Sequence, residues 1–119
     1  MTDLWHYTCE HGVEGILTDG TVNPTLNPVL TDAHGAPVTL AWFTDLDTPW
    51  RDALGLTSHT LRCDRTAFRF VVVEPEKCTR WVTVRGTYPR AAVDALEGAS
   101  GVMPMHWWVA AGPVRAVLP

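Results

Sequence analysis

The stretch Thr66-Ala67-Phe68-Arg69-Phe70-Val71-Val72-Val73 predicts a β-strand more clearly than any other part of the chain. It is rich in aromatic and β-branched residues. Glu74-Pro75 ends it, because proline restricts the residue before it and cannot donate to a sheet. Similar patterns outward from this stretch predict further strands at 4–8, 38–44, 80–85, 106–110 and 114–118. The alternation over 80–85 predicts a half-exposed strand, and 114–118 is expected at a sheet edge.

Two short helices are expected. Residues 9–19 space their apolar side chains three and four apart, with Thr8 as the N-cap and Gly20 as the stop. Residues 89–97 show a second apolar face of the same kind. Residues 21–37 are expected to form a long loop, because asparagine, aspartate, glycine and proline recur there at close intervals.

The predicted strands outnumber the helices and do not alternate with them, which disfavours a parallel βαβ arrangement. We therefore expect a single α+β domain over residues 1–119, with a curved, mostly antiparallel sheet and two or three short helices. A chain of 119 residues with 46% hydrophobic side chains is long enough for one core and too short for two.

Several features predict a cytoplasmic protein that does not enter a membrane. No apolar run approaches the roughly 20 residues of a membrane span. The N-terminus lacks the basic start and apolar stretch of a secretory signal. The three cysteines are odd in number and have no Cys-x-x-Cys spacing, which argues against a disulfide framework.

The net charge of −4 conceals a division along the chain. Residues 1–60 hold eight acidic side chains and one basic one, whereas residues 61–119 hold five acidic and eight basic ones. This pattern fits either an ordinary solvated surface or an arginine-lined groove for phosphate. The negative net charge argues against non-specific coating of nucleic acid, but it leaves a local phosphate site open. Neither Gly-x-Gly-x-x-Gly nor a P-loop is present, which excludes those phosphate sites.

Two strand ends carry residues suited to a ribose or a flat ring. His6 and Thr8 share one face of the first strand, where an imidazole and a hydroxyl can bond a ribose hydroxyl. Trp42-Phe43-Thr44 combines aromatic rings with a hydroxyl at the end of another strand. The alternatives are structural: Thr8 as a cap beside a surface His6, and core packing for Trp42 or Phe43.

Further candidates are cationic or metal-binding. Arg65 and Arg69 stand four apart and could grip a diphosphate, or they could pair with nearby carboxylates. His6, Cys9 and His11 lie within six residues, but no second ligand pair follows at zinc-finger spacing. We therefore predict no metal site and keep a zinc-linked enzyme as a minor alternative.

Taken together, residues 4–8 and 13–24 resemble the opening of the compact ADP-ribosyltransferases. That opening has a strand ending in His-x-Thr or His-x-Ser, a helix, then Ile-Leu-x-x-Gly and a turn with proline, which here are His6-Tyr7-Thr8 and the stretch from Ile16 to Pro24. The nearest likeness is to DNA-modifying ADP-ribosyltransferase toxins, and a more distant one is to RNA 2′-phosphotransferases and poly(ADP-ribose) polymerases. Residues 38–44 are similar to the second strand of that superfamily.

This resemblance implies a split β-sandwich and NAD as the substrate. It implies that His6 binds the adenine-side ribose and that an aromatic ring stacks near the nicotinamide. A late glutamate should hold the ribose hydroxyl as nicotinamide leaves; Glu97 is the candidate, with His106 at a strand start as its possible substitute. The cofactor-binding set is then His6, Tyr7, Thr8, Trp42, Phe43, Thr44, Arg65 and Arg69.

The predicted function is ADP-ribosyl transfer from NAD to a nucleic acid or protein acceptor, in a toxin or phage-conflict system. The alternative is a catalytically inactive module of the same fold that binds NAD, a related nucleotide or a partner.

Overall fold

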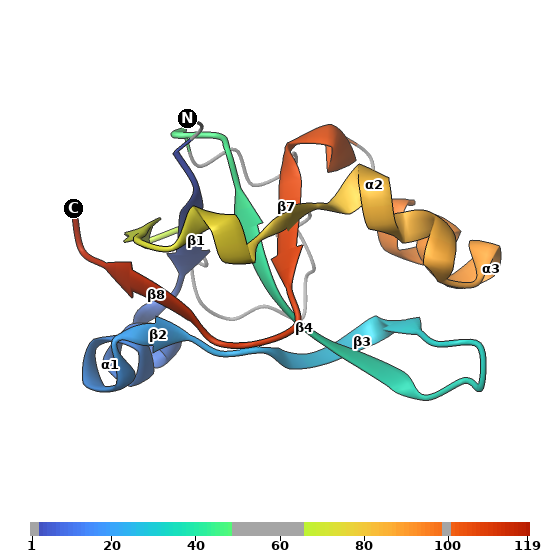
Figure 1. Ribbon diagram of the computed structural model, residues 1–119, viewed down its shortest axis with the longest axis horizontal. Coiled ribbons are helices and arrows are strands. Elements are labelled where there is room, and N and C mark those ends of the chain that lie inside the picture. The colour runs from blue at the N-terminus through green and yellow to red at the C-terminus, as the bar shows by residue number, and fades with distance from the viewer. Residues whose placement is uncertain (1–2, 49–65, 99–100) are drawn as a thin grey trace.

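An antiparallel sheet runs through the protein, which a computed structural model describes for residues 3–48, 66–98 and 101–119 (Figure 1). The strands pair in the order β2-β8-β5-β1-β4-β7-β6, with β3 paired to β4 outside this path, and all these pairings are antiparallel. Their bounds are β1 (Trp5–Thr8), β2 (Thr21–Val22), β3 (Thr25–Thr31), β4 (Pro37–Thr44), β5 (Phe68–Val72), β6 (Thr79–Arg80), β7 (Trp107–Ala110) and β8 (Val114–Val117).

Three α-helices and three 3₁₀ turns complete the described part of this single α+β domain. They are α1 (Glu10–Asp19), α2 (Trp81–Val84) and α3 (Arg90–Glu97), with η1 (Pro75–Lys77), η2 (Arg85–Thr87) and η3 (Pro104–His106). The predicted α+β class and mostly antiparallel sheet are confirmed. Among the described residues, no helix has the length and apolar character needed to cross a membrane.

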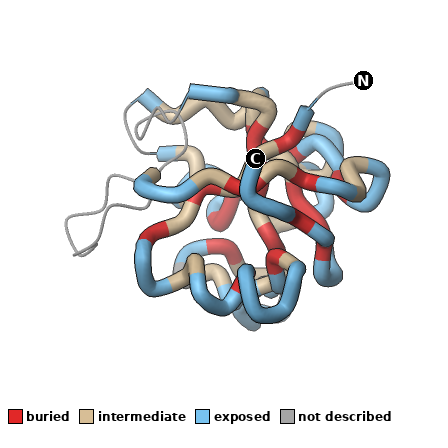
Figure 2. Tube along the Cα trace, turned by 90° about the vertical axis from the view of Figure 1, so that its left-hand side faces the viewer, coloured by how far each residue is buried: buried red, intermediate tan, exposed pale blue. Residues whose placement is uncertain are grey.

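The central strands separate two hydrophobic clusters. Side chains alternate across a strand, so Phe43 of β4 enters one cluster and its neighbours Trp42 and Leu40 enter the other. The first cluster includes Ile16 of α1, and the second includes Val93 of α3. In Figure 2 the buried positions lie mainly in the interior of the molecule. Helix α1 therefore packs against the first cluster, and α2 and α3 pack against the second.

The loop expected over 21–37 is wrong, because β2, β3 and the start of β4 occupy it. The turn-forming residues act inside and between strands. The Asn27 side chain accepts hydrogen bonds from the N–H groups of Val29 and Leu30, at 2.8 Å each, where the β3 register shifts. Asp32 accepts from two N–H groups of the turn before β4, in which Gly35 has a φ of 80°.

The strand expected over 80–85 is also wrong: only its first residue is extended, and α2 follows. Trp81 is fully buried in the second cluster, and Val84, one helical turn later, packs against the same cluster. Burial of the indole at this position outweighs the β-propensity of the segment.

Two smaller expectations also need correction. The helix α1 begins after Cys9, which takes the N-cap position expected for Thr8, while Gly20 ends the helix as expected with a φ of 71°. The strand β8 lies between β2 and β5, so it is not the sheet edge that the sequence suggested.

Candidate functional site

His6 lies in the middle of the sheet, on β1 between β5 and β4. Its Nδ1 is 2.7 Å from the backbone carbonyl oxygen of Trp42 on β4. A carbonyl can only accept, so Nδ1 carries the hydrogen and Nε2 of the neutral ring keeps a lone pair. Burial lowers the pKa of His6 below its ordinary value, and the hydrogen bond to Trp42 opposes this shift in part. The ring is therefore held neutral.

The free nitrogen of His6 remains available to a ligand. Within the described residues, the bond to Trp42 is the only hydrogen bond of this ring. His6 is half-buried, so the residue keeps some contact with the surface. The ring edge meets Phe43, with ring centroids 5.8 Å apart. His6 thus offers an accepting nitrogen to a hydroxyl group.

An aspartate and a second histidine meet at the ends of β4 and β7. Asp45 directly follows β4, and its Oδ1 is 2.6 Å from Nδ1 of His106, which directly precedes β7. Its other carboxylate oxygen accepts from the Trp108 indole N–H at 3.1 Å. The Asp45 backbone N–H also donates to the His106 carbonyl at 3.3 Å. Both carboxylate oxygens of Asp45 therefore accept hydrogen bonds. The His106 ring is held through Nδ1, and its Nε2 is not used in this contact.

The sheet register brings His6 and this pair to one face. Phe43 pairs with Trp108 across β4 and β7, so their side chains share a face, and His6 contacts Phe43 from β1. Asp45 lies two residues beyond Phe43 and bonds Trp108 on that same face. The register Trp5↔Thr44, continued one residue past the end of β4, places Asp45 diagonally across from His6, an arrangement with a typical separation of about 7–8 Å. In the described residues His6 makes no hydrogen bond to Asp45 or His106. We call His6, Asp45 and His106 the polar triad.

This arrangement suits chemistry at a ribose. A carboxylate that orients a histidine through Nδ1 leaves Nε2 to take or give a proton. The same carboxylate supplies negative charge near any cation that develops on the ligand. His6, kept neutral, can accept from a hydroxyl without repelling that cation.

Other predicted nucleotide-binding residues have structural contacts instead. The Tyr7 hydroxyl donates to the Leu46 carbonyl at 3.0 Å, and burial raises the pKa of this phenol. Thr44 is buried, and its hydroxyl accepts from the Leu46 N–H at 3.1 Å. Thr8 lies against α1, where its Oγ1 would meet any side chain added at Gly12. Each of the three residues holds a strand end in place.

The cation and the stacking ring expected beside His6 lie elsewhere. Arg69 pairs with Tyr7 on the opposite face of β1, with its guanidinium 4.2 Å from the Trp5 ring centre and NH1 2.7 Å from the Asp47 carbonyl. Trp42 packs against Trp81 and Trp107 in the second cluster. Of the expected aromatic pair, Phe43 alone meets His6. Arg65 falls outside the described residues.

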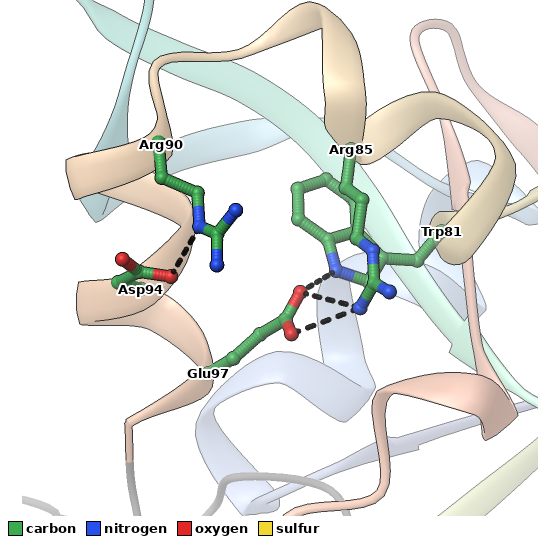
Figure 3. A network of polar contacts seen from close by, with 5 residues as sticks. All are labelled: Trp81, Arg85, Arg90, Asp94 and Glu97. Atoms are coloured by element: carbon green, nitrogen blue, oxygen red, sulfur yellow. Dashed lines mark hydrogen bonds and ion pairs between the residues drawn. The ribbon is translucent and has the colours of Figure 1, made fainter.

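Glu97 does not join His6. It lies near the end of α3, where its carboxylate accepts from the Trp81 indole at 2.7 Å and from Arg85 at 3.0 Å (Figure 3). Helix α3 stands well apart from β1, across the strands β4 and β7 (Figure 1). The sequence suggested a catalytic role for this glutamate because it is a late carboxylate, but its contacts are those of a link between helices.

The zinc alternative has no ligand set in the described residues, where no three His, Cys, Asp or Glu side chains are grouped to hold a metal ion. The Cys9 thiol lies 3.6 Å from Nδ1 of His11.

Comparisons with protein-family models, curated proteins and solved structures find no match to this chain. Function is therefore inferred from sequence motifs and site geometry alone.

Sequence reasoning missed Asp45. It directly follows the strand Trp42-Phe43-Thr44, so position after a strand end was one available signal. Its partner His106 is 61 residues away, and only the pairing of β4 with β7 brings the two together. No local spacing pattern marks such a pair.

Proposed function

We propose that this protein binds NAD and transfers its ADP-ribose to a nucleic acid or protein acceptor, with nicotinamide as the leaving group. The observation that carries the proposal is the polar triad: His6 of the His-x-Thr motif shares a sheet face with the Asp45–His106 pair. The resemblance of residues 4–24 to ADP-ribosyltransferases supports NAD as the substrate. A cytoplasmic place of action, in a toxin or phage-conflict system, belongs to the same proposal.

In this proposal His6 positions the substrate. Its Nε2 accepts a hydrogen bond from a ribose hydroxyl, while Nδ1 stays bound to the Trp42 carbonyl. Because the ring is anchored at one nitrogen, little freedom is lost when the other binds.

The Asp45–His106 pair then acts on the reacting centre. The bond between C1′ of the nicotinamide ribose and the pyridinium nitrogen breaks, and its electron pair leaves with neutral nicotinamide. Positive charge develops on the ribose, and the Asp45 carboxylate stabilises it. An acceptor oxygen or nitrogen forms the new bond to C1′ and gives its proton to Nε2 of His106. In this proposal Asp45 stabilises the reacting ribose by its charge, in place of the late glutamate that the resemblance expects to hold the ribose hydroxyl.

The alternative is a module that binds the nucleotide without turning it over. One observation favours it: the late glutamate is held by Trp81 and Arg85, away from His6. Under this alternative His6 still binds the ribose, and Asp45 serves only to join β4 to β7.

Calorimetric titration with NAD, ADP-ribose and nicotinamide tests the binding step. We expect the wild-type protein to bind NAD and ADP-ribose, and His6→Ala to weaken both by about tenfold or more, the value of one hydrogen bond to a well-placed group. His34→Ala is the matched control, because His34 is exposed in the turn before β4. Absence of binding by the wild-type protein would refute both the transferase and the module.

A further inference from the structure

A cleft of about 430 Å³ lies between η2 and α3. This volume falls within the usual range of small-molecule sites, about 300–1,000 Å³. None of its lining residues belongs to the proposed NAD site. They are Arg85, Gly86, Tyr88, Arg90, Val93, Asp94 and Glu97.

Two guanidinium groups line this cleft, and each bonds a carboxylate (Figure 3); the Arg85–Glu97 pair is partly buried, whereas the Arg90–Asp94 pair is largely exposed. Arg85 donates from Nη1 to both carboxylate oxygens of Glu97, at 3.0 Å and 3.4 Å. Arg90 donates from Nε to Asp94 at 3.1 Å, one helical turn along α3. Within the described residues these are the only hydrogen bonds of the two guanidinium groups, so both terminal nitrogens of Arg90 and one of Arg85 remain free to donate.

Glu97 is fixed more firmly than an ordinary surface carboxylate. The indole N–H of Trp81 donates to it at 2.7 Å, and the Trp81 side chain is fully buried. Arg85 is thus anchored through Glu97 to the second hydrophobic cluster. A guanidinium that is positioned in advance loses less conformational entropy when it binds a planar anion.

The charges and walls of the cleft restrict its ligand. Two guanidinium groups face two carboxylates, so the lining is neutral overall and suits a single negative charge better than two. Tyr88 and Val93 supply an apolar wall, and the Tyr88 ring stacks on Trp81 with centroids 5.7 Å apart. We propose that this cleft binds a small monoanion with a flat ring, through a carboxylate or a phosphodiester group gripped by Arg85 and Arg90. This proposal goes beyond the NAD site and does not depend on it.

Four ring compounds with different charges test the proposal. Benzoate and methyl phenyl phosphate are monoanions, phenyl phosphate is mostly a dianion at pH 7.5, and benzamide is neutral. Titration followed by NMR reads the Trp81 indole N–H, assigned through a Trp81→Phe variant. We expect saturable shifts from at least one monoanion and no saturable shift from benzamide. Comparison of benzoate with methyl phenyl phosphate shows whether the cleft prefers a carboxylate or a phosphodiester.

Substitutions locate the binding. Arg85→Gln and Arg90→Gln should each weaken monoanion binding by about tenfold, whereas Arg115→Gln, the same charge change on β8, should leave it unchanged. Asp94→Asn removes one negative charge from the lining and should raise the affinity for phenyl phosphate relative to benzoate severalfold. Because Asp94 is exposed, this variant should keep its fold.

Two results would overturn the proposal. One is the absence of saturable binding by both monoanions, or equal binding of benzamide. The other is an Arg85→Gln variant that unfolds at lower urea but binds the monoanion as tightly as the wild type, since Arg85 would then be only a link between η2 and α3.

Discussion

The Asp45 carboxylate and the His106 imidazole lie 2.6 Å apart at the ends of two neighbouring strands. The pairing of Thr44 with Trp107 sets this contact, because the residue after one and the residue before the other must then lie side by side. Asp45 also accepts from Trp108, so it joins β4 to β7 and orients His106 at the same time.

Removing the Asp45 carboxylate should destabilise the protein. Asp45→Ala leaves the donors of His106 and Trp108 without their acceptor, and we expect a loss of about 2–3 kcal/mol in the free energy of unfolding. Asp45→Asn keeps one accepting oxygen and should cost less. Urea denaturation measures both. Equal stability of Asp45→Ala and the wild type would show that this carboxylate does not hold the two strands together.

Protonation of His6 should oppose folding in mild acid. Burial lowers the pKa of His6 in the folded protein below its ordinary 6.5. As the pH falls below about 6.5, the unfolded chain therefore binds a proton that the folded chain does not, and stability declines until the folded pKa is reached. The decline attributable to His6 is at most about 1.4 kcal/mol per pH unit.

The His6→Gln variant isolates this effect, because glutamine does not titrate and other groups titrate equally in both proteins. Urea unfolding at pH 7.5 and 5.5 should show a smaller loss of stability for the variant than for the wild type. Identical losses would contradict a neutral, buried His6.

Two glycines of α1 should respond oppositely to alanine. A Cβ at Gly15 would meet no atom within 4 Å, so Gly15→Ala should stabilise the protein by about 0.5–1 kcal/mol through helix propensity. A Cβ at Gly12 would fall 2.2 Å from Thr8 Oγ1, so Gly12→Ala should destabilise it by about 1–2 kcal/mol. Thermal unfolding ranks the two variants.

The double variant Thr8→Ala, Gly12→Ala is the control for this steric contact. Removal of the Thr8 hydroxyl should recover most of the stability lost in Gly12→Ala. A double variant no better than the sum of the two single changes would exclude the close approach of β1 to α1 at this point.

Trp81→Phe should destabilise the protein strongly. The change leaves a cavity in the second cluster and removes the indole donor to Glu97, which together should cost about 2–4 kcal/mol. Urea denaturation gives the value, and a double-mutant cycle with Glu97→Gln separates the hydrogen bond from the packing. A cycle without coupling would mean that the 2.7 Å contact does not stabilise the fold.

The strands with continuous apolar or aromatic runs could be predicted from sequence, because burial on a sheet selects those residues locally. The helix after Arg80 could not be predicted from sequence. It forms because Trp81 is buried in a cluster whose other members are distant in sequence. The hairpin of β3 and β4 was not predicted because Asn27 and Asp32 are typical of loops. In the structure Asn27 bonds the backbone at an irregularity within β3, and Asp32 bonds the backbone of the turn between the strands.

The candidate site divides in the same way. His6 could be found from its motif, because the motif is local. The role of Asp45 could not be predicted, because it depends on the pairing of β4 with β7. The position of Glu97 away from His6 could not be predicted either, because it depends on the contact of Glu97 with Trp81.

The release of nicotinamide from NAD tests the central claim most directly. With an added nucleic acid or protein acceptor, or with water in its place, the wild-type protein should release nicotinamide and ADP-ribose should appear on the acceptor or in solution. Asp45→Asn should reduce that rate by about 10²–10³-fold, the usual value of one electrostatic contact in a transition state, while NAD still binds. A wild-type protein that binds NAD but releases no nicotinamide, or an Asp45→Asn variant that releases it at the wild-type rate, would contradict the assignment of catalysis to the polar triad.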